Sequence, residues 1–373
     1  MSPELYIGLM SGTSMDGVDA VLLRAESDGR VHALAHDHQP FGAELRAELM
    51  ALNAPTDNEL QRAALAANAV SRVYAQACRA LLMAQRLSPT EIRALGAHGQ
   101  TVRHRPGEFD GTGFSIQLLN APLLAELTGV AVVHDLRGRD VAAGGQGAPL
   151  VPAFHRAVLA QPGVDVVVLN VGGISNVSLL RADGQGGGFD CGPGNCLMDG
   201  WIHRHQGLDY DAGGQWASQG RVHGALLEAL LAEPYFRLPP PRSTGRDLFH
   251  LAWLDARIAA HAPAIAPVDV QATLLELTAR CVVDSLAAFA PGSWRELLVC
   301  GGGAFNDALL RRLRALLPAV AVDTTEVKGL PPMLVEGAAF AWLAMRHVRG
   351  LSGNLPEATG ATGPRILGSY TPA

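Results

Sequence analysis

The chain has 373 residues, of which 48% are hydrophobic and 17% charged, a profile typical of a globular protein with a sizeable core. The formal net charge is −6 and no basic run occurs, which argues against a nucleic-acid partner. No apolar run reaches the roughly 18 residues of a membrane span, and no basic stretch precedes a long apolar one, so we expect neither a membrane partner nor a secretion signal. The five scattered cysteines fit reduced thiols in the cytoplasm.

A β-hairpin is predicted near the N-terminus. Apolar residues at 5–10 and 18–23 flank a small polar turn at 11–17. The turn offers bare backbone N–H groups and hydroxyls, which can form an anion-binding concavity. Asp16 and Asp19 suit a phosphate that carries Mg²⁺, because this ion binds through one or two carboxylates plus phosphate oxygens. The alternative is a tight turn whose Asp and Ser side chains only satisfy the backbone.

After the hairpin, strands and helices alternate. Thr56, with Glu59 three residues later, predicts a capping box at the start of a long Ala/Leu-rich helix. Asn120 caps a later helix. His98 and Gln100 lie at a strand end, where ligand groups often sit in open α/β sheets. The predicted strands lie at 31–35, 94–96, 115–118 and 130–136, and the predicted helices at 42–52, 57–85 and 121–127.

A charged and glycine-rich stretch, HDLRGRDVAAGGQGAPL, follows the last of these strands. We interpret it as a crossover between two domains; the alternative is a surface loop with ordinary salt bridges. The opening pattern then returns, because a β-branched strand at 164–171, a turn at Gly172 and Gly173 and a strand at 177–180 repeat strand–turn–strand. Two such loops, one in each half, suit a polyphosphate that is held from both sides.

Asp190 lies in the run FDCGPGN, after a short strand and before a predicted helix at 195–203. A carboxylate among small residues at such a junction can accept a proton from a bound hydroxyl or water. It can also cap the helix, which is the usual role of an aspartate in front of a helix. The residues alone leave both roles open.

A third glycine-rich turn occurs late in the chain. The glycines at 301–303 lie between a buried strand at 296–300 and a helix at 306–316, which indicates that the backbone comes very close to something flat or anionic. Upstream, Arg242 and Arg246 lie in a Pro/Gly-rich loop and either contact a nucleotide or are solvated. Further helices are predicted at 222–231, 251–260, 268–289 and 333–347, with a strand at 320–323 and no long element after 351.

Together the loops stand in a fixed order: hairpin loop, crossover, second hairpin loop, strand–GGG–helix and a final helix. This order resembles the nucleotide-binding pattern of the superfamily of sugar kinases, heat-shock-protein-70 chaperones and actin. Seven segments, spread from residue 8 to about residue 340, are similar to motifs of the anhydro-N-acetylmuramic acid kinase family. A chance coincidence of all seven is not credible. They are GLMSGTSMDGVD, GAHGQT, DVAAGGQGAPLVPAFH, NVGGISN, FDCGPGN, STGR and CGGGAFN.

The resemblance implies a fold and a division into domains. The fold class is α/β, with two ribonuclease-H-like domains of the actin-like ATPase type and ATP in the cleft between them. The first domain is expected at 1–140 plus about 345–373, with the first phosphate loop. The second is expected at 141–344, with the second phosphate loop and the adenosine motif. The family also suggests a homodimer.

The resemblance implies a reaction as well. A member of this family uses ATP and water to open 1,6-anhydro-N-acetylmuramic acid and to phosphorylate it at O6, giving N-acetylmuramate 6-phosphate and ADP in cell-wall recycling. Asp190 matches the family's catalytic base, which favours the base over the cap. Arg139 and Glu336 match sugar-binding positions, and His98 is a further candidate there. The implied ATP-binding residues are Gly12, Thr13, Ser14, Met15, Asp16, Gly17, Val18, Asp19, Gly172, Gly173, Gly301, Gly302 and Gly303.

Two other classes of protein stay open. A sugar hydrolase that acts without ATP would keep Asp190 and a second carboxylate but has no use for three glycine-rich loops. An ATP-dependent clamp of the chaperone or actin type would keep the loops but needs neither a sugar pocket nor a base beside it. Titrations with an ATP analogue and with the anhydro-sugar separate the three classes.

Overall fold

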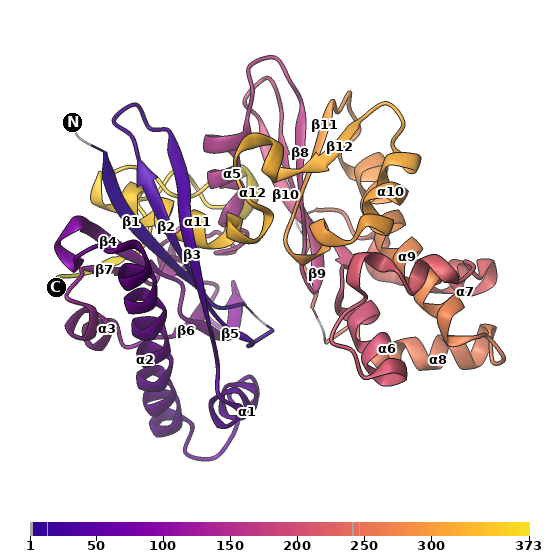
Figure 1. The fold of residues 1–373 in the computed structure, drawn as a ribbon, viewed down its shortest axis with the longest axis horizontal. Coiled ribbons are helices and arrows are strands. Elements are labelled where there is room, and N and C mark those ends of the chain that lie inside the picture. The colour runs from indigo at the N-terminus through magenta and orange to yellow at the C-terminus, as the bar shows by residue number, and fades with distance from the viewer. Residues whose placement is uncertain (1–2, 13, 241, 246) are drawn as a thin grey trace. The chain divides into compact units, whose positions relative to one another are not determined.

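The chain forms two compact units, whose ribbons are shown in Figure 1. Unit 1 consists of Met1–Val158 and Leu334–Ala373, and unit 2 consists of Leu159–Met333. Two residues named in the sequence analysis, Thr13 of the predicted ATP site and Arg246 of the Pro/Gly-rich loop, lie outside the described residues. In the part of the chain that is described, no helix is long and apolar enough to cross a membrane. The computed structural model describes residues 3–12, 14–240, 242–245 and 247–373.

The main sheet of unit 1 is mixed. Its strands, with a separate hairpin of β5 and β6, are β1 (Glu4–Met10), β2 (Gly17–Ala25), β3 (Val31–Pro40), β4 (Ile92–Ala97), β5 (Gln100–Pro106), β6 (Gly113–Leu118), β7 (Val132–His134) and β13 (Ser369–Thr371). Their order in the main sheet is β13-β7-β4-β1-β2-β3. β1, β2 and β3 form an antiparallel meander, whereas β1, β4 and β7 run parallel. β13 pairs antiparallel with β7 at the edge.

Two helices cover opposite faces of this sheet (Figure 1). Ile7 and Leu9 of β1 pack into one core with buried residues of α2. Gly8, which points to the other face because side chains alternate along a strand, lies so close to α11 that a Cβ there would be 1.8 Å from the Gly337 carbonyl oxygen. The helices of unit 1 are α1 (Ala43–Ala51), α2 (Glu59–Gln85), η1 (Pro89–Glu91), α3 (Ala121–Thr128), α4 (Gly138–Ala142), α5 (Val151–Leu159), α11 (Val335–Val348) and α12 (Pro356–Thr359).

Unit 2 repeats the same arrangement of strands. Its strands are β8 (Val166–Val171), β9 (Ile174–Leu180), β10 (Gly186–Pro193), β11 (Glu296–Cys300) and β12 (Ala321–Thr324). Their order is β10-β9-β8-β11-β12. β8, β9 and β10 form the antiparallel meander, and β8, β11 and β12 run parallel. Both units therefore share the strand order of a ribonuclease-H-like domain, which confirms the predicted fold class and the predicted internal repeat.

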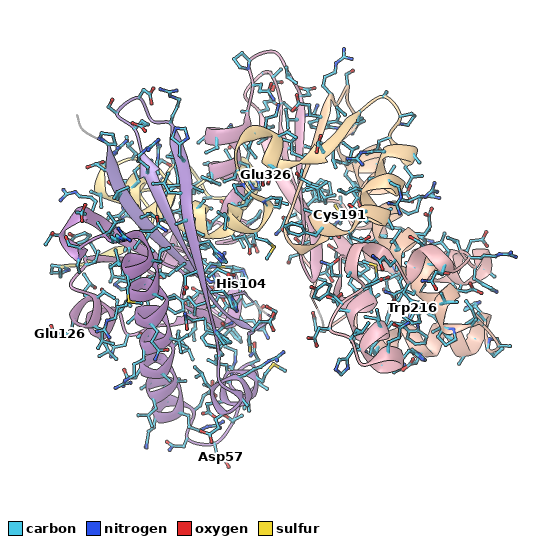
Figure 2. All side chains as sticks on the ribbon, viewed as in Figure 1. Asp57, His104, Glu126, Cys191, Trp216 and Glu326 are labelled. Atoms are coloured by element: carbon cyan, nitrogen blue, oxygen red, sulfur yellow. The ribbon has the colours of Figure 1, made fainter. Side chains whose placement is uncertain are left out.

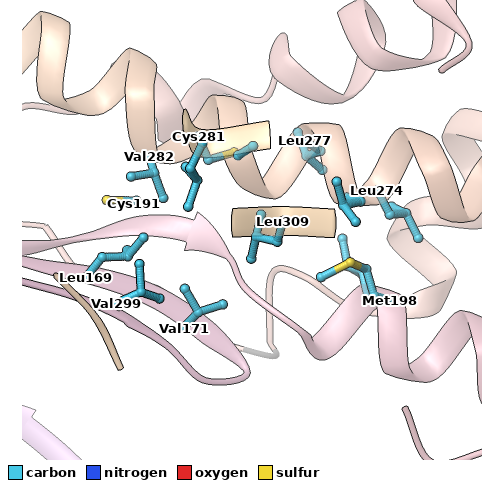
Figure 3. Packing of buried hydrophobic residues seen from close by; sticks show 14 of the residues in the cluster. Leu169, Val171, Cys191, Met198, Leu274, Leu277, Cys281, Val282, Val299 and Leu309 are labelled. Carbon is cyan, nitrogen blue, oxygen red and sulfur yellow. The ribbon is translucent and has the colours of Figure 1, made fainter. Parts of the chain in front are cut away.

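The core of unit 2 lies between its sheet and several helices. Leu169 and Val171 of β8 and Val299 of β11 face buried side chains of α9, as Figure 3 shows. Leu309 of α10 and Met198 of α6 belong to the same cluster. The helices of unit 2 are α6 (Cys196–Gln206), η2 (Ala212–Gly214), η3 (Ala217–Gln219), α7 (Gly224–Leu231), η4 (Pro234–Arg237), α8 (Leu251–His261), α9 (Pro267–Phe289), η5 (Gly302–Phe305), α10 (Asp307–Leu316), η6 (Thr325–Lys328) and η7 (Pro332–Leu334).

The unit boundaries differ from those expected at residues 140 and 344. α5 and α11 belong with unit 1, where the Phe154 and Trp342 rings lie 6.0 Å apart, centroid to centroid. α11 packs on the first sheet because the glycines of β1 and β4 leave room for its backbone. A Cβ on Gly96 would lie 2.0 Å from the Phe340 carbonyl oxygen. The two units therefore divide after Val158 and after Met333.

One local prediction is wrong. Thr56 does not cap α2; its hydroxyl accepts a hydrogen bond from Arg62 at 2.8 Å, and Asn58 is the N-cap residue. The C-terminal tail holds no long element, as expected, although its short strand β13 joins the first sheet. In contrast, Asn120 caps α3 as predicted, because its Oδ1 accepts a hydrogen bond from the Leu123 N–H at 3.0 Å.

Candidate active site

The first of the loops predicted to bind phosphate joins β1 to β2 in unit 1. A Cβ added to Gly12 would meet nothing closer than the Ser14 hydroxyl at 3.6 Å, so space for a ligand is open there. Gly17 is different, because its Cβ would lie 2.3 Å from the Gln39 carbonyl oxygen of the neighbouring strand. Met15 has a positive φ of 56°, which bends the loop before Asp16. Gly12 is therefore suited to close approach by a phosphate, whereas Gly17 is required by the packing of the sheet.

The GAHGQT motif supports this loop from behind. The Gln100 side-chain amide donates a hydrogen bond to the Gly12 carbonyl at 3.1 Å. The Ser11 hydroxyl lies 3.2 Å from the Gly99 carbonyl and 2.7 Å from the Tyr74 hydroxyl. The His98 Nδ1–H donates to the Ser11 carbonyl at 3.1 Å. These bonds hold the backbone of the loop in place before any ligand binds.

His98 is buried and neutral. Burial, assisted by the positive charge of Arg137, lowers the pKa of His98 to about 3. Since Nδ1 donates to Ser11, Nε2 is free to accept from the guanidinium of Arg137, at 2.9 Å from Nη2 and 3.2 Å from Nε. A second histidine nearby, His104 (Figure 2), also has its pKa lowered to about 4, chiefly by burial. His98 thus connects the phosphate loop to Arg137.

Arg137 lies at the centre of the predicted sugar-binding residues of unit 1. Its Nη1 donates to the Gly147 carbonyl at 2.7 Å. Burial lowers the pKa of Arg137 to about 10, although the carboxylates of Glu336 and Asp140 act to raise it. The structure therefore brings His98 and Glu336 together around Arg137.

Arg139, the predicted sugar-binding arginine, is placed differently. It is exposed on α4 and forms no hydrogen bond or ion pair with the residues that are described. Its guanidinium is available to a ligand, whereas that of Arg137 is already engaged by His98 and Gly147. Sequence spacing alone did not distinguish the surroundings of the two arginines.

The two carboxylates predicted to bind Mg²⁺ differ in their partners. Asp19 Oδ1 accepts hydrogen bonds from His36 at 3.0 Å and from His38 at 2.9 Å, and although burial opposes it, these bonds hold the pKa of Asp19 below its usual value. Asp16 is exposed, and its only ion pair among the described residues is a long one with Arg46, at 3.5 Å. No group of three metal-binding side chains occurs among the residues described. Asp16 is thus the carboxylate that is better placed to join a metal held mainly by phosphate oxygens and water.

The second loop, at Gly172 and Gly173, is held by main-chain groups. The Gly172 carbonyl accepts from the Asn195 N–H at 2.8 Å, and the Gly173 carbonyl accepts from the N–H groups of Gly194 at 2.9 Å and Cys196 at 3.1 Å. The start of α6 is therefore tied directly to this turn. A Cβ on Gly172 would meet nothing closer than the Ile174 carbonyl at 3.7 Å, so the turn is open to a ligand.

The glycines at 301–303 have two different roles. A Cβ on Gly301 would lie 2.3 Å from Asn170 Oδ1, and one on Gly303 would lie 2.3 Å from a Val171 methyl group. These two glycines allow the chain to pass close to β8. Gly302 is exposed, and a Cβ there would meet only Asn195 Nδ2, at 3.5 Å. The close approach predicted from the sequence is thus, at Gly301 and Gly303, an approach to other atoms of this protein. Of the three glycines, Gly302 is the one that leaves space for a ligand.

Asp190 lies inside β10 and not at its end. The strand continues to Pro193, and Asn195 is the N-cap residue of α6. The interpretation of Asp190 as a helix cap is therefore wrong, and so is its expected position at a strand-to-helix junction. The gly-rich run was not expected to continue as a strand, but pairing with β9 extends it, with a bulge between Asp190 and Gly192.

The environment of the Asp190 carboxyl favours proton transfer near neutral pH. Burial raises its pKa to about 6, although a hydrogen bond from the Thr244 N–H and the charge of Arg242 act in the opposite direction. The Thr244 N–H donates to Oδ2 at 3.0 Å, and Oδ1 takes no hydrogen bond from the described residues. A carboxylate whose pKa lies close to the working pH, with one oxygen free, can serve as a general base. Its neighbour Cys191 marks this position in Figure 2.

The residues that hold Asp190 were not identified from sequence. Arg242 was expected either to contact a nucleotide or to be solvated, but it is buried and its Nε donates to the Asp190 carbonyl at 3.0 Å. The Tyr235 hydroxyl donates to the same oxygen at 2.8 Å. The available signal was the STGR motif, which contains Thr244 and directly follows Arg242.

A groove of about 500 Å³ lies in unit 2 beside the helix that follows the glycines at 301–303. One wall is charged, because Arg312 forms a two-pronged ion pair with the buried Glu276 at 2.5 and 2.8 Å. The rest of the wall consists mainly of small side chains. The groove is lined by Ala217, Ser218, Gly220, Val222, Ala272, Leu275, Glu276, Ala308, Arg311, Arg312 and Ala315.

Solved structures resemble this chain only distantly. An activator of the 2-hydroxyisocaproyl-CoA dehydratase from Clostridium difficile with bound ADPNP has a TM-score of 0.48 at 12% identity, covering 93% of this chain and 96% of that one. A ROK family glucokinase from Streptomyces griseus in complex with glucose and AMPPNP has a TM-score of 0.40 at 14% identity, covering 92% and 99%. The fold assignment rests on the strand order and not on these likenesses.

Sequence relatives are much closer. A protein of Variovorax paradoxus named anhydro-N-acetylmuramic acid kinase is 57% identical over 380 residues, covering 100% of both chains. One of the same name from Cupriavidus metallidurans is 52% identical over 375 residues, covering 100% of this chain and 98% of the relative. The family model for anhydro-N-acetylmuramic acid kinase matches residues 4–373. With a match that runs from the first strand to the last residue, this chain belongs to the anhydro-N-acetylmuramic acid kinase family.

Proposed function

We propose that this enzyme uses ATP and water to open 1,6-anhydro-N-acetylmuramic acid and to phosphorylate it at O6, as its family membership implies. The products are N-acetylmuramate 6-phosphate and ADP, and the reaction serves peptidoglycan recycling and amino sugar catabolism. The observation that carries the mechanism is the Asp190 carboxyl, which has a raised pKa of about 6 and one oxygen that no described residue occupies.

Asp190 acts as the general base. It takes a proton from a water molecule while the water oxygen forms a bond to C1 of the sugar and the C1–O6 bond breaks. The released O6 then attacks the γ-phosphorus of ATP, and the bond from that phosphorus to the β,γ-bridging oxygen breaks to give ADP. A carboxylate that activates water at an anomeric carbon is the usual device of glycoside hydrolysis, and at neutral pH a group with a pKa near 6 is mostly ionised.

The phosphates of ATP bind to backbone N–H groups of the open glycine turns. Gly12 in unit 1 and Gly172 in unit 2 leave room for close approach, and Gly302 does so beside the adenosine motif. We place the adenosine in the groove between α9 and α10, whose volume of about 500 Å³ and small side chains suit a flat base. Phosphoryl transfer needs mainly positioning and charge neutralisation, which such loops supply.

Mg²⁺ would be held by Asp16, together with phosphate oxygens and water, and Asp19 lies close behind in sequence. When bound, the ion neutralises charge on the phosphates. Asp16 would hold the ion at the edge of the loop. Asp19 instead links β2 to β3 through its hydrogen bonds with His36 and His38. We expect turnover to stop in excess chelator and to return with added Mg²⁺; full activity in chelator contradicts the proposal.

In unit 1, Arg139 binds the lactyl carboxylate of the sugar, because a guanidinium matches the planar geometry of a carboxylate. His98 and Glu336 contribute through their shared neighbour Arg137. The cytoplasmic location and the homodimer that the family suggests belong to this proposal too, and light scattering of the purified protein tests the latter.

The decisive experiment follows the oxygen of water. Product made in ¹⁸O water should carry the label at the anomeric oxygen and none in the phosphate, which mass analysis of the fragments reads directly. Because the anomeric hydroxyl of a free sugar exchanges slowly with water, unlabelled product incubated in ¹⁸O water for the same time is the control. Label in the phosphate means that water attacks ATP, and the role of Asp190 is then rejected.

A further inference from the structure

Arg242 is a buried arginine, and each of its three side-chain nitrogens donates a hydrogen bond. Its side chain is embedded in unit 2, with the whole residue only 8% exposed. Nη2 donates to the Ser285 hydroxyl at 2.7 Å, and Nη1 donates to the carbonyls of Leu238 at 2.9 Å and Phe236 at 3.1 Å. Nε donates to the Asp190 carbonyl at 3.0 Å. The guanidinium is therefore fixed in one orientation.

Aromatic rings surround this guanidinium. Its central carbon lies 4.7 Å from the ring centroid of Phe289, 5.1 Å from that of Tyr235 and 5.3 Å from that of Phe189. Such ring faces stabilise a cation without neutralising it. No carboxylate among the described residues bonds to Arg242, so its charge is left to act on the acidic group nearby, which is Asp190.

Asp190 is held at its main chain and at its carboxyl by one short segment. Its N–H donates to the Arg242 carbonyl at 3.3 Å, and its carboxyl accepts from the Thr244 N–H at 3.0 Å. Its carbonyl accepts from both Arg242 and Tyr235. The bulge that follows Asp190 requires Gly192, where a Cβ would lie 2.6 Å from the Phe236 ring. The bulged strand keeps its shape because these groups enclose it.

We propose that Arg242 is the positioning residue of the catalytic carboxylate: it fixes the bulged backbone of β10 at the Asp190 carbonyl and presents a buried positive charge to the Asp190 carboxylate. This inference rests on the proposed function, in which Asp190 is the base. Arg242 acts through Asp190 and does not itself touch the reacting atoms.

Other titratable groups near Asp190 stay neutral in the working range. Burial raises the pKa of Cys191 to about 12, and burial also raises the pKa of Tyr235 above its ordinary value. Burial has the largest effect on the ionisation of Asp190, and among the described residues Arg242 is the charged group that acts against it. An opposite charge nearby lowers a carboxyl pKa by roughly 1–3 units, so loss of this charge has a measurable effect on the pH dependence of turnover.

The test compares pH profiles of kcat at saturating substrates for the wild type, Arg242→Gln, Arg242→Lys and Tyr235→Phe. In the wild type, activity rises with pH through the Asp190 pKa, near 6. Arg242→Gln removes the charge, so its acidic limb should move up by roughly one pH unit and its plateau should fall by roughly 10-fold to 100-fold through misplacement of the carboxylate. Arg242→Lys keeps the positive charge but loses the planar guanidinium. The acidic limb of its pH profile should therefore stay in place, while the plateau of kcat falls. Tyr235→Phe should lower the plateau slightly without moving the limb.

The matched control is Arg181→Gln, because Arg181 also lies over an aromatic ring in unit 2, with its central carbon 4.7 Å from the Trp294 centroid, but does not contact Asp190. Its profile should equal that of the wild type. An Arg242→Gln profile with an unmoved limb and a plateau within about two-fold of the wild type overturns the inference. If that variant fails to fold, as judged by circular dichroism, an Arg242→Lys enzyme with a wild-type plateau overturns it instead.

The proposed function fails separately from this inference. Asp190→Asn that still turns over rejects Asp190 as the base, and with it both proposals. Asp190→Asn that is inactive, together with Arg242 variants that behave as the wild type, rejects only the positioning role.

Discussion

The two glycine-rich hairpin loops occupy the same place in the two sheets, after the first strand of each meander. In unit 1, side chains that follow the parallel strand β4 hold the loop, because His98 and Gln100 donate to the carbonyls of Ser11 and Gly12. In unit 2 the loop is held chiefly by main-chain groups, because the carbonyls of Gly172 and Gly173 accept N–H groups from the start of α6. One topology thus allows two ways of fixing the loop between the first two strands of the meander.

The buried titratable groups of the two units also differ in sign. In unit 1, burial keeps His98 and His104 neutral by lowering their pKa values to about 3 and about 4. In unit 2, burial raises the pKa of Asp190 to about 6. Main-chain support does not titrate, whereas side-chain support by histidine does. The two buried histidines of unit 1 and Asp190 of unit 2 therefore respond to pH in opposite directions.

The largest effect should come from the carboxylate of unit 2. Asp190→Asn should lower turnover by roughly 10²–10⁴-fold, which is typical of lost acid–base catalysis, while ATP still binds. Because the folded pKa of Asp190 is raised, its ionisation opposes folding, and the stability present below the unfolded value of 3.8 is lost as pH rises through about 6. The Asn variant should thus be more stable at pH 8, by up to about 3 kcal/mol. A variant that is inactive but also less stable at pH 8 would point to damage to the fold.

The next effect concerns the sugar and unit 1. Arg139→Ala should raise the KM for the anhydro-sugar by roughly 10-fold or more, since a hydrogen bond to a charged group contributes about 1.5–3 kcal/mol. The KM for ATP should be retained. Arg72→Ala is the matched control, because Arg72 is likewise an exposed helical arginine of unit 1. Equal sugar affinity in both variants would make Arg139 an ordinary surface charge.

A smaller effect tests how unit 1 is covered by α11. Gly8→Ala places a methyl group where the Gly337 carbonyl lies 1.8 Å away, so α11 has to shift. Overpacking of this kind destabilises by about 1–3 kcal/mol, and thermal melting should show it. Gly42→Ala is the control, because its φ is −63° and nothing lies within 4 Å of its Cβ. If the two variants melt together, α11 is not held against β1 as described.

The smallest effect per group is the response of unit 1 to acid. His98 and His104 have folded pKa values below the unfolded value of 6.5, so the stability they contribute is present above pH 6.5 and is lost as pH falls. His98 lowers the free energy of unfolding by about 1.4 kcal/mol for every pH unit between this value and its folded pKa. The effect of His104 is smaller, because solvent screens its partly exposed ring. Hydrogen exchange at pH 7 and pH 4.5 should show β4 losing protection before β11. Equal loss in both strands would remove this difference between the units.

Sequence reasoning predicted the regular elements well where local signals are strong. The bounds of β11 are the predicted ones, since an apolar run is closed by glycines, and both hairpins appear where strand–turn–strand was read. α4 was missed because it has only five residues and starts at a glycine. β13 was missed because three residues show no periodicity, and their pairing with β7 is decided far away in sequence.

Within the site, sequence identified glycine positions but not the reason for each one. Gly17, Gly301 and Gly303 make room for neighbouring protein atoms, whereas Gly12 and Gly302 are open. This distinction depends on distances to other strands, which spacing along the chain does not contain. The strand around Asp190 was likewise imposed by pairing with β9, against the low β propensity of its glycines.

Unit 1 is discontinuous, and this has a consequence for synthesis. Unit 2 ends at Met333, but the first sheet still lacks α11 and β13, which belong to Leu334–Ala373. At about 5–20 residues per second, a ribosome needs roughly 2–8 s to make this last segment. During that time the glycine-lined face of β1 and β4 has no helix to cover it. Unit 1 is therefore begun before unit 2 but completed after it, and residues 334–373 cover a face of strands that were synthesised much earlier.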